Sequence, residues 1–361
     1  MTKRKEFFNK FNIHLRELKI FQNAYYWFIV PLAIVFIALV CGTVYEMADT
    51  RYEGFANVGV DFKGGTVLTV KMTSADLINL NYDENVDLIF DLAEEHGVNI
   101  SSIQTSGSDS FVLRYTNTVN GEDFNSAEKT ADMITVNTAL TKDIQDKLVE
   151  KYNLSSVSEV TVTAELINAT ASSEFVGNAF LAIGITILLT FIYIIVRFDA
   201  FSSIASLLSI IHDIIVMMAF VIIFNLPIGS TLIAGIITVV GFSINNTIVV
   251  FDRVRETLKP FKNKKSKIEP RYIVNTTVAD TLTRSLFTIV STMLTILVLA
   301  VVGVPALTEF SLPIIFGLAA GLYSSVFIAP TIWGLLMQAK QKKDSSKKSN
   351  YKKGTPQRVR R

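Results

Sequence analysis

The chain is poor in the residues that build disulfides and metal centres. Its 361 residues include one cysteine, Cys41, and three histidines. One cysteine excludes an internal disulfide, and a zinc site built from several cysteines or histidines is not expected. The sequence also has no glycine-rich loop followed by Lys and Ser or Thr, which argues against ATP hydrolysis. We therefore expect no catalytic site, no metal and no cofactor, and the protein is not predicted to be an enzyme.

Apolar residues, in contrast, make up 50% of the chain and gather into six long runs. Each run is long enough to cross ~30 Å of hydrocarbon at ~1.5 Å of helix per residue. The first run exceeds the apolar length of a usual signal peptide and is predicted to be a retained anchor. The sequence therefore predicts six transmembrane helices, in the apolar runs 25–45, 176–196, 203–225, 229–251, 286–304 and 312–337.

Charge separates the two sides of the membrane. Residues 48–175 carry 21 acidic and 8 basic side chains, whereas the segments before the first run, between the fourth and fifth, and after the sixth are basic. Because basic segments stay in the cytoplasm, both termini are predicted to be cytoplasmic. The predicted organisation is a basic N-terminus (1–24), a first helix (25–47), an extracytoplasmic domain (48–175), five helices (176–338) with a basic loop (252–277), and a disordered basic tail (339–361).

The basic segments have a simple expected partner. Lys and Arg near a membrane surface are attracted to anionic lipid by ~1 kcal/mol per residue. No aromatic residues are interleaved with these charges in a way that would favour nucleic acid, so no specific nucleic-acid partner is expected.

The acidic segment has the periodicities of a small α+β domain. Its elements follow the order β-α-β-β-α-β over about 120 residues, which is the split βαβ pattern of a ferredoxin-like domain. The predicted strands cover 58–72, 98–105, 111–115 and 159–166, and the predicted helices cover 84–96 and 128–152. The fold class is thus an α-helical membrane protein with six transmembrane helices plus an α+β ferredoxin-like extracytoplasmic domain between helices 1 and 2.

Two ionisable residues in the apolar runs are candidates for function. Asp213, beside His212, lies ~15 Å into the third run, near the middle of the bilayer. Burial there disfavours an ionised carboxylate, which suits a proton carrier, and the alternative is a structural hydrogen bond between helices. Arg284 lies near the start of the fifth run. Its side chain either extends to the membrane interface or takes part in an ion path.

Four motifs occur in a fixed order: "GVDFKGG" (59–65), "RFD" (197–199), "HD" (212–213) and "SINNTIVVFDRVRE" (243–256). Together with six helices and one large domain after the first helix, they resemble the SecF family of the Sec protein-export machinery. The residues that carry this resemblance in the first and last motifs are Asp61, Phe62, Gly64, Gly65, Asp252 and Arg253.

The resemblance implies a subunit in the bacterial plasma membrane that pairs with SecD in a twelve-helix assembly of the resistance-nodulation-division superfamily. It also implies the SecYEG channel, a YidC-type insertase and unfolded secretory polypeptides as further partners, with ion flow helping to pull the exported chain outward. The alternative from the same superfamily is half of an exporter for lipids or small molecules.

The sequence departs from the family at Asn246. SecF-like sequences usually have an acid at this position, next to Asn245, and that acid is thought to take part in proton passage. An amide cannot take up and release a proton at neutral pH. Asn245 and Asn246 are therefore either interhelical hydrogen-bonding residues or the remnant of an ion path whose proton-binding step lies in Asp213 or in the partner. Asp280, one helical turn before Arg284, and Asp213 are the candidate counter-ions for Arg284. The coupling ion, proton or sodium, stays open.

Overall fold

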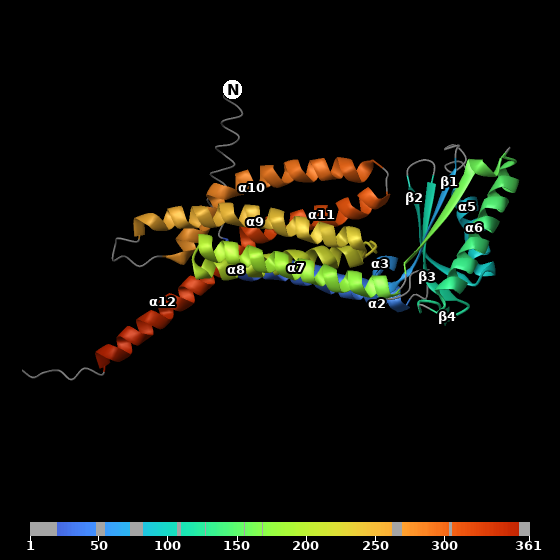
Figure 1. The fold of residues 1–361 in the computed structure, drawn as a ribbon. Helices are drawn as coiled ribbons and strands as arrows, with labels where there is room; N and C mark the ends of the chain where they lie inside the picture. The colour runs from blue at the N-terminus through green and yellow to red at the C-terminus, as the bar shows by residue number, and fades with distance from the viewer. Residues whose placement is uncertain are drawn as a thin grey trace, which may run out of the picture.

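The protein has two parts, a bundle of long helices and a small α+β domain at one end of it (Figure 1). The α+β domain lies between the first and second long helices in sequence. The structure, a computed structural model, describes residues 20–47, 55–72, 82–106, 110–126, 128–154, 156–167, 169–261, 269–302 and 305–353.

The bundle contains six candidate membrane spans among the described residues, judged by length and composition, which confirms the predicted number. The last span is interrupted by a π-helical segment, η3 (Ser324–Ile328), a helix irregularity that often occurs at functional sites. The spans are α2 (Ala24–Met47), α7 (Ala169–Arg197), α8 (Ala200–Ile223), α9 (Ser230–Leu258), α10 (Pro270–Val301), and α11 (Pro305–Tyr323) continued through η3 into α12 (Ala329–Lys353).

The helices differ in how much of their surface lies inside the bundle. α8, α9 and α11 form its interior, where Met217, Val239 and Leu318 are buried. The outer helices expose large apolar side chains, including Phe36 on α2, Leu188 on α7 and Leu294 on α10. Apolar surface of this extent needs lipid or another membrane subunit to cover it.

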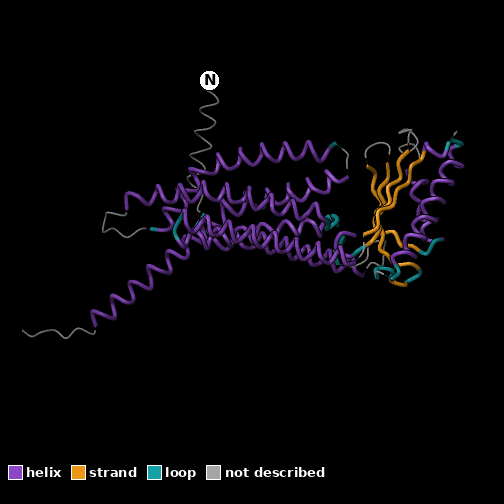
Figure 2. The backbone as a smooth tube through the Cα atoms, in the orientation of Figure 1, coloured by secondary structure: helices purple, strands orange, loops and turns teal. Residues whose placement is uncertain are grey.

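The α+β domain has the predicted β-α-β-β-α-β order. Its strands are antiparallel in the spatial order β2-β3-β1-β5, and the two-residue β4 pairs with β3. Helices α5 and α6 lie on the face of the sheet that points away from the bundle (Figures 1 and 2). The core between them includes Phe111, Leu113 and Ile144. The elements are β1 (Gly65–Met72), α5 (Tyr82–Glu95), β2 (Val98–Ser106), β3 (Ser110–Val119), β4 (Glu122–Asp123), α6 (Thr130–Tyr152), η1 (Val157–Glu159) and β5 (Val160–Ile167).

Several predicted boundaries are corrected. The second membrane helix begins at residue 169, before the predicted domain boundary at 175. The loop predicted over 252–277 is helical at both ends, because α9 runs to Leu258, the 3-10 turn η2 (Lys259–Phe261) follows, and Pro270 starts α10 in the favourable first helical position. Predicted disorder is wrong for residues 339–353, where α12 continues with good helix formers such as Lys and Gln. Residues 1–19, 262–268 and 354–361 lie outside the described part.

Candidate functional site

Asp213 lies at the centre of the bundle and is held from two neighbouring helices. Its side chain is 1% exposed. His212 Nδ1 lies 3.0 Å from Asp213 Oδ1, and Ser243 on α9 donates a hydrogen bond to Oδ2. Gly321 on α11 brings that helix close, since a Cβ there would lie 3.6 Å from Oδ2. The carboxyl group is thus enclosed by hydrogen-bonding side chains and shielded from lipid.

Hydroxyl and aromatic groups continue this polar centre to both sides. Ser209 on α8 donates to Ser324 Oγ at 2.8 Å, at the start of the π-helical segment. The His212 ring stacks on Tyr323, with centroids 6.3 Å apart, and the Tyr323 hydroxyl donates to the Trp27 carbonyl on α2 at 2.9 Å. The network therefore links α2, α8 and the π-helical break.

Asn245 and Asn246 do not form one site. Successive residues of an α-helix point ~100° apart, because one turn takes 3.6 residues. Asn246 is 4% exposed and faces the interior of the bundle, whereas Asn245 is exposed on its outer surface. The two amides therefore contribute to different surfaces of α9, and only Asn246 is placed for contacts within this chain.

Arg284 is exposed on the outer surface of α10. Asp280, expected to be its counter-ion, pairs instead with Arg253 of α9, so that expectation is wrong. Asp213, the other expected counter-ion, is engaged with His212 and Ser243. Among the described residues, none of the ion pairs of the bundle includes Arg284. The physical reason is helix geometry: Asp280 faces α9, which offers a closer guanidinium.

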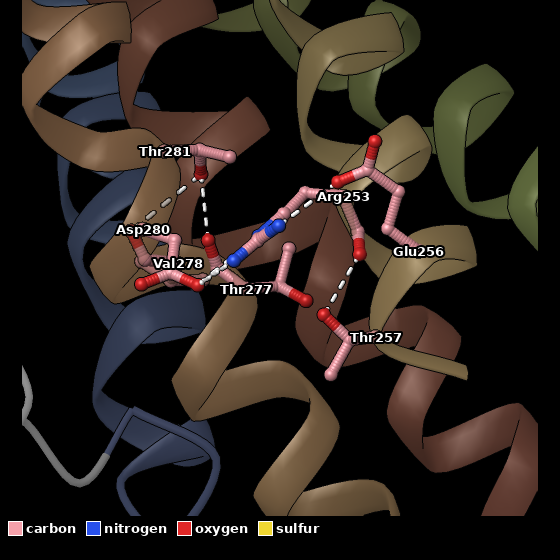
Figure 3. Close-up of polar contacts among 7 residues, drawn as sticks. All are labelled: Arg253, Glu256, Thr257, Thr277, Val278, Asp280 and Thr281. Carbon is pink, nitrogen blue, oxygen red and sulfur yellow. Dashed lines mark hydrogen bonds and ion pairs between the residues drawn. The ribbon is translucent and has the colours of Figure 1, made fainter. Parts of the chain in front are cut away.

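The "DR" of the fourth motif ties three helices together at the end of the bundle opposite the α+β domain. Arg253 lies between Asp280 and Glu256 (Figure 3). Its Nε and Nη2 lie 3.0 and 2.5 Å from Asp280 Oδ2 on α10, and its Nη1 lies 2.9 Å from Glu256 Oε2. Asp252, the preceding residue, accepts from Arg197 at the end of α7 at 3.1 Å. Two adjacent residues of α9 thus make ion pairs in different directions, one to α7 and one to α10.

The "GVDFKGG" motif joins the α+β domain to the bundle. Asp61 Oδ2 accepts from the backbone N–H of Ser230 at 2.8 Å, at the first residue of α9. Ser172 on α7 donates to the Asp61 carbonyl at 2.8 Å. Phe62 packs edge-on against Phe175 of α7, with centroids 5.6 Å apart. One short segment therefore contacts two membrane helices at the ends that lie next to the α+β domain.

The conformation of this motif explains its glycines. Residues Val60–Lys63 form one helical turn, α3, where the sequence predicted a strand. Gly64 ends that turn with φ +76°, which favours glycine. A Cβ at Gly65 would lie 2.5 Å from the carbonyl oxygen of Tyr115, so only glycine allows β1 to approach β3 so closely at this point. The paired glycines are thus required by a packed junction.

A family model described as "Protein export membrane protein SecD/SecF, C-terminal" matches residues 147–339, which is more than half of the chain. The chain belongs to this family. The matched residues include the Asp213 centre, both asparagines, the "DR" pairs and Arg284, whereas the "GVDFKGG" junction precedes them.

Individual relatives of this SecD/SecF-family chain are SecF and SecDF proteins, which agrees with the match to the family model. SecF of Helicobacter pylori strain J99 is 28% identical over 322 residues, covering 89% of this chain and 88% of that protein. SecDF of Bacillus subtilis is 35% identical over 202 residues, which is 56% of this chain but only 26% of the relative. The solved structure of SecDF from Thermus thermophilus, described as a translocon-associated membrane protein, superposes with a TM-score of 0.61 at 25% identity, covering 87% of this chain and 38% of that one.

One contact between the α+β domain and the bundle of this SecD/SecF-family chain was not predicted from the sequence. Arg114 on β3 forms an ion pair with Glu309 on α11, with Nη1 and Oε1 2.9 Å apart and side chains 18% and 11% exposed. The available signal was Glu309 itself, the one acidic residue in the short connection between the fifth and sixth apolar runs. Among the described residues, no group of three or more His, Cys, Asp or Glu side chains is arranged to hold a metal ion.

Proposed function

We propose that this chain is a SecF-type subunit that pairs with SecD in the bacterial plasma membrane and assists the outward movement of secreted proteins, using an ion gradient. The observation that carries the proposal is the buried Asp213, held by His212 and Ser243 inside a helix bundle whose family is known. A carboxyl in this environment is costly to keep for structure alone, and intramembrane acids of this kind mark ion pathways.

The α+β domain is assigned to the outer side and to the ferredoxin-like class. Its antiparallel order β2-β3-β1-β5 with two helices on one face supports the class. Basic residues at the opposite end of the bundle, such as Arg255 on α9 and Lys340 on α12, support cytoplasmic termini, because Lys and Arg are retained on that side. In this orientation the domain stands where an exported chain emerges.

SecD is proposed as the partner because the outer surface of the bundle is incomplete. Arg284 and Asn245 are exposed among apolar side chains such as Phe287 and Phe242. A guanidinium facing hydrocarbon is unfavourable by several kcal/mol unless another chain supplies an acid or a water-filled path. The 202 residues that align with the B. subtilis SecDF cover 26% of that protein, and SecD would supply part of the remainder as a separate subunit. The SecYEG channel and a YidC-type insertase complete the proposed assembly.

The partner is tested by affinity purification of the tagged full-length chain from its native membrane in mild detergent. We expect SecD and SecYEG in the eluate. A matched Arg284→Ala variant should recover less SecD, because the proposed acidic group of SecD loses its cationic partner. Purification without SecD at any detergent concentration that keeps the chain folded would contradict the proposal and favour an exporter half for lipids or small molecules.

The ion pathway is tested at Asp213. Asp213→Asn keeps the size and hydrogen-bonding ability of the side chain but removes its proton exchange, so gradient-driven export of a reporter in inverted vesicles should fall by tenfold or more. Asn246→Asp is the matched control: it adds a carboxyl one helix away and should leave export at or above the wild-type level. Imposing either a proton or a sodium gradient identifies the ion. Unchanged export by Asp213→Asn would contradict the role of this residue.

A further inference from the structure

The two edges of the sheet are built differently. β2, at one edge, has register shifts between Val98 and Ile100 and between Ile100 and Ser102. β5, at the other edge, pairs with β1 in an unbroken register of eight residues, Val160 to Ile167, and its sequence "VTVTAELI" has no proline or lysine. Bulges, proline and lysine are the usual protections of an edge strand against pairing with another chain. β5 has none of these protections.

The outer side of β5 has no backbone partner among the residues that the structure describes. Among the described residues, none of the backbone hydrogen bonds outside the regular elements involves residues 161–166, and no further strand lies beyond β5. An unprotected row of backbone N–H and C=O groups is a template for another extended segment.

A groove runs between this edge and helix α6. It is a cavity of about 220 Å³ lined from α6 by Ile134, Asn137, Thr138 and Thr141, and from β5 by Ala164 and Leu166. The four α6 residues recur at helical spacing, so they form one face of the helix alongside the strand. Strand edge, helix face and hollow together have the form of sites that bind a peptide by strand addition.

Two side chains show that this hollow is incompletely filled. Val162 and Leu166 of β5 pack against the core of the domain, and Ala164 between them faces the same side but is exposed. Thr141 Oγ1 is buried and has no hydrogen-bond partner among the described residues. Ile134, at the rim, is 52% exposed. The hollow thus has a small side chain, an unpartnered hydroxyl and an exposed apolar rim, and it has room for an incoming side chain.

We propose that β5 and α6 form a binding groove for an extended segment of polypeptide, which adds as a fifth long strand and places one side chain in the hollow beside Ala164. The occupant is an export client, and this part of the proposal rests on the proposed function. Backbone pairing recognises any extended chain, which suits clients that share no sequence. The acidic excess of residues 48–175 favours neutral or basic segments over acidic ones.

The test uses the purified full-length chain in detergent with a fluorescent peptide of alternating valine and threonine as the probe. A matched peptide with proline at every second position lacks the N–H donors that a strand needs. We expect the first peptide to bind at least tenfold more tightly than the second, measured by fluorescence anisotropy. Equal binding of the two peptides would overturn strand addition.

Two substitutions on the same strand provide the site control. Ala164→Phe fills the hollow, whereas Thr163→Phe places the same ring on the opposite face, because successive strand residues alternate. Both positions are exposed, so both variants should fold. Peptide affinity should fall at least tenfold for Ala164→Phe and change less than about twofold for Thr163→Phe, given that tenfold corresponds to ~1.4 kcal/mol. Equal effects of the two variants would overturn the assignment to this groove.

Export and copurification distinguish this proposal from the proposed function. Reduced reporter export by Ala164→Phe, with SecD still copurifying, supports a client in the groove. Loss of SecD from the Ala164→Phe variant would overturn the client assignment, since SecD would then be the occupant. If the peptide binds but SecD fails to copurify even with the wild-type chain, the proposed function fails and the groove remains. If SecD copurifies and the peptide does not bind, the groove fails alone.

Discussion

Tyr115 shows how a single buried side chain sets a pH limit for the α+β domain. Its ring is fully buried and its hydroxyl donates to Asn137 Oδ1 at 2.8 Å. Burial raises the pKa of the phenol well above its ordinary value, while the unfolded chain ionises near pH 10. The folded state thus keeps a proton that the unfolded state loses. This contribution is complete below about pH 10 and is lost as the pH rises toward the higher folded pKa.

We therefore expect the melting temperature of the wild-type protein to fall as the pH rises above about pH 10. Tyr115→Phe should be less stable at neutral pH, by about 1 kcal/mol for the lost hydrogen bond, and should lose less stability on alkaline titration. Tyr25→Phe, at a tyrosine that is 85% exposed, is the matched control and should keep the wild-type slope. Parallel slopes for all three proteins would contradict the role of Tyr115.

At the same scale, the sequence identified residues better than it identified their partners. Asp213 and the glycines of "GVDFKGG" were identified from the sequence, because an acid in an apolar run and paired glycines at a junction are visible without coordinates. In the structure, Asp213 is buried in the bundle and the glycines lie at a packed junction. The predicted partner of Asp280 was wrong. Spacing along one helix suggested Arg284, whereas the neighbouring helix supplies Arg253. A contact between helices depends on how they pack, and the pattern of one chain segment does not contain it.

At the scale of elements, the first turn of α9 is capped by a side chain that is distant in the sequence. Its preceding residue, Gly229, has no side chain to cap the first turn, and Asp61 supplies the carboxylate instead. Asp61→Ala should therefore cost ~1 kcal/mol, as loss of an N-cap does, whereas Asp61→Asn keeps an oxygen acceptor and should cost less. Thermal unfolding in detergent measures both. An equal loss for Asn and Ala would show that the negative charge, and not the acceptor, carries the effect.

Close packing at the start of β1 gives a second prediction for elements. In Gly65→Ala the new methyl group would meet the carbonyl oxygen of Tyr115, which cannot rotate away, so we expect a loss of ~1 to 3 kcal/mol from overpacking. Gly177→Ala on α7 is the matched control, because no atom lies within 4 Å of its added Cβ, and it should be neutral or stabilising by up to ~1 kcal/mol. Limited proteolysis of the α+β domain reports the difference. Equal protease resistance of both variants would contradict the packing argument.

The elements themselves were largely predictable, and their ends were not. Six apolar runs and a β-α-β-β-α-β order follow from hydropathy and periodicity, which are local properties. The continuation of α12 to Lys353 was missed because a basic, polar composition suggested disorder, although Lys and Gln also favour helix. The single turn of α3 was missed because its neighbours are β-rich and its cause is the docking of Asp61.

At the scale of the whole molecule, the described residues show two groups of contacts between the α+β domain and the bundle. The first is the Asp61 junction with the adjoining backbone contacts of residues 57–59 to Ile228, and the second is the ion pair of Arg114 with Glu309. Removing one member of a mostly buried ion pair costs ~3 to 5 kcal/mol, because the remaining charge stays unpaired. Arg114→Ala should therefore release the domain to rotate about the Asp61 junction, seen as a broader distance distribution between spin labels on α6 and α11.

Exchanging the two charges provides the control for that release. Arg114→Glu combined with Glu309→Arg recreates the pair in reverse and should narrow the distribution again, more than the two single variants predict by addition. A distribution that stays narrow in Arg114→Ala would show that the Asp61 junction alone fixes the domain.

The Asp61 junction also fixes an order of events during synthesis. Asp61 and Ser230 are 169 residues apart, so at a ribosomal rate of about 5 to 20 residues per second the partner appears roughly 10 to 30 s after Asp61. By the time Ser230 is made, the whole α+β domain, α7 and α8 have been synthesised, whereas most of α9 has not. The sheet and core of the domain lie within residues 65–167, so their folding does not need α9. We therefore expect the domain to fold first, and the Asp61 contact to form only when α9 is in place.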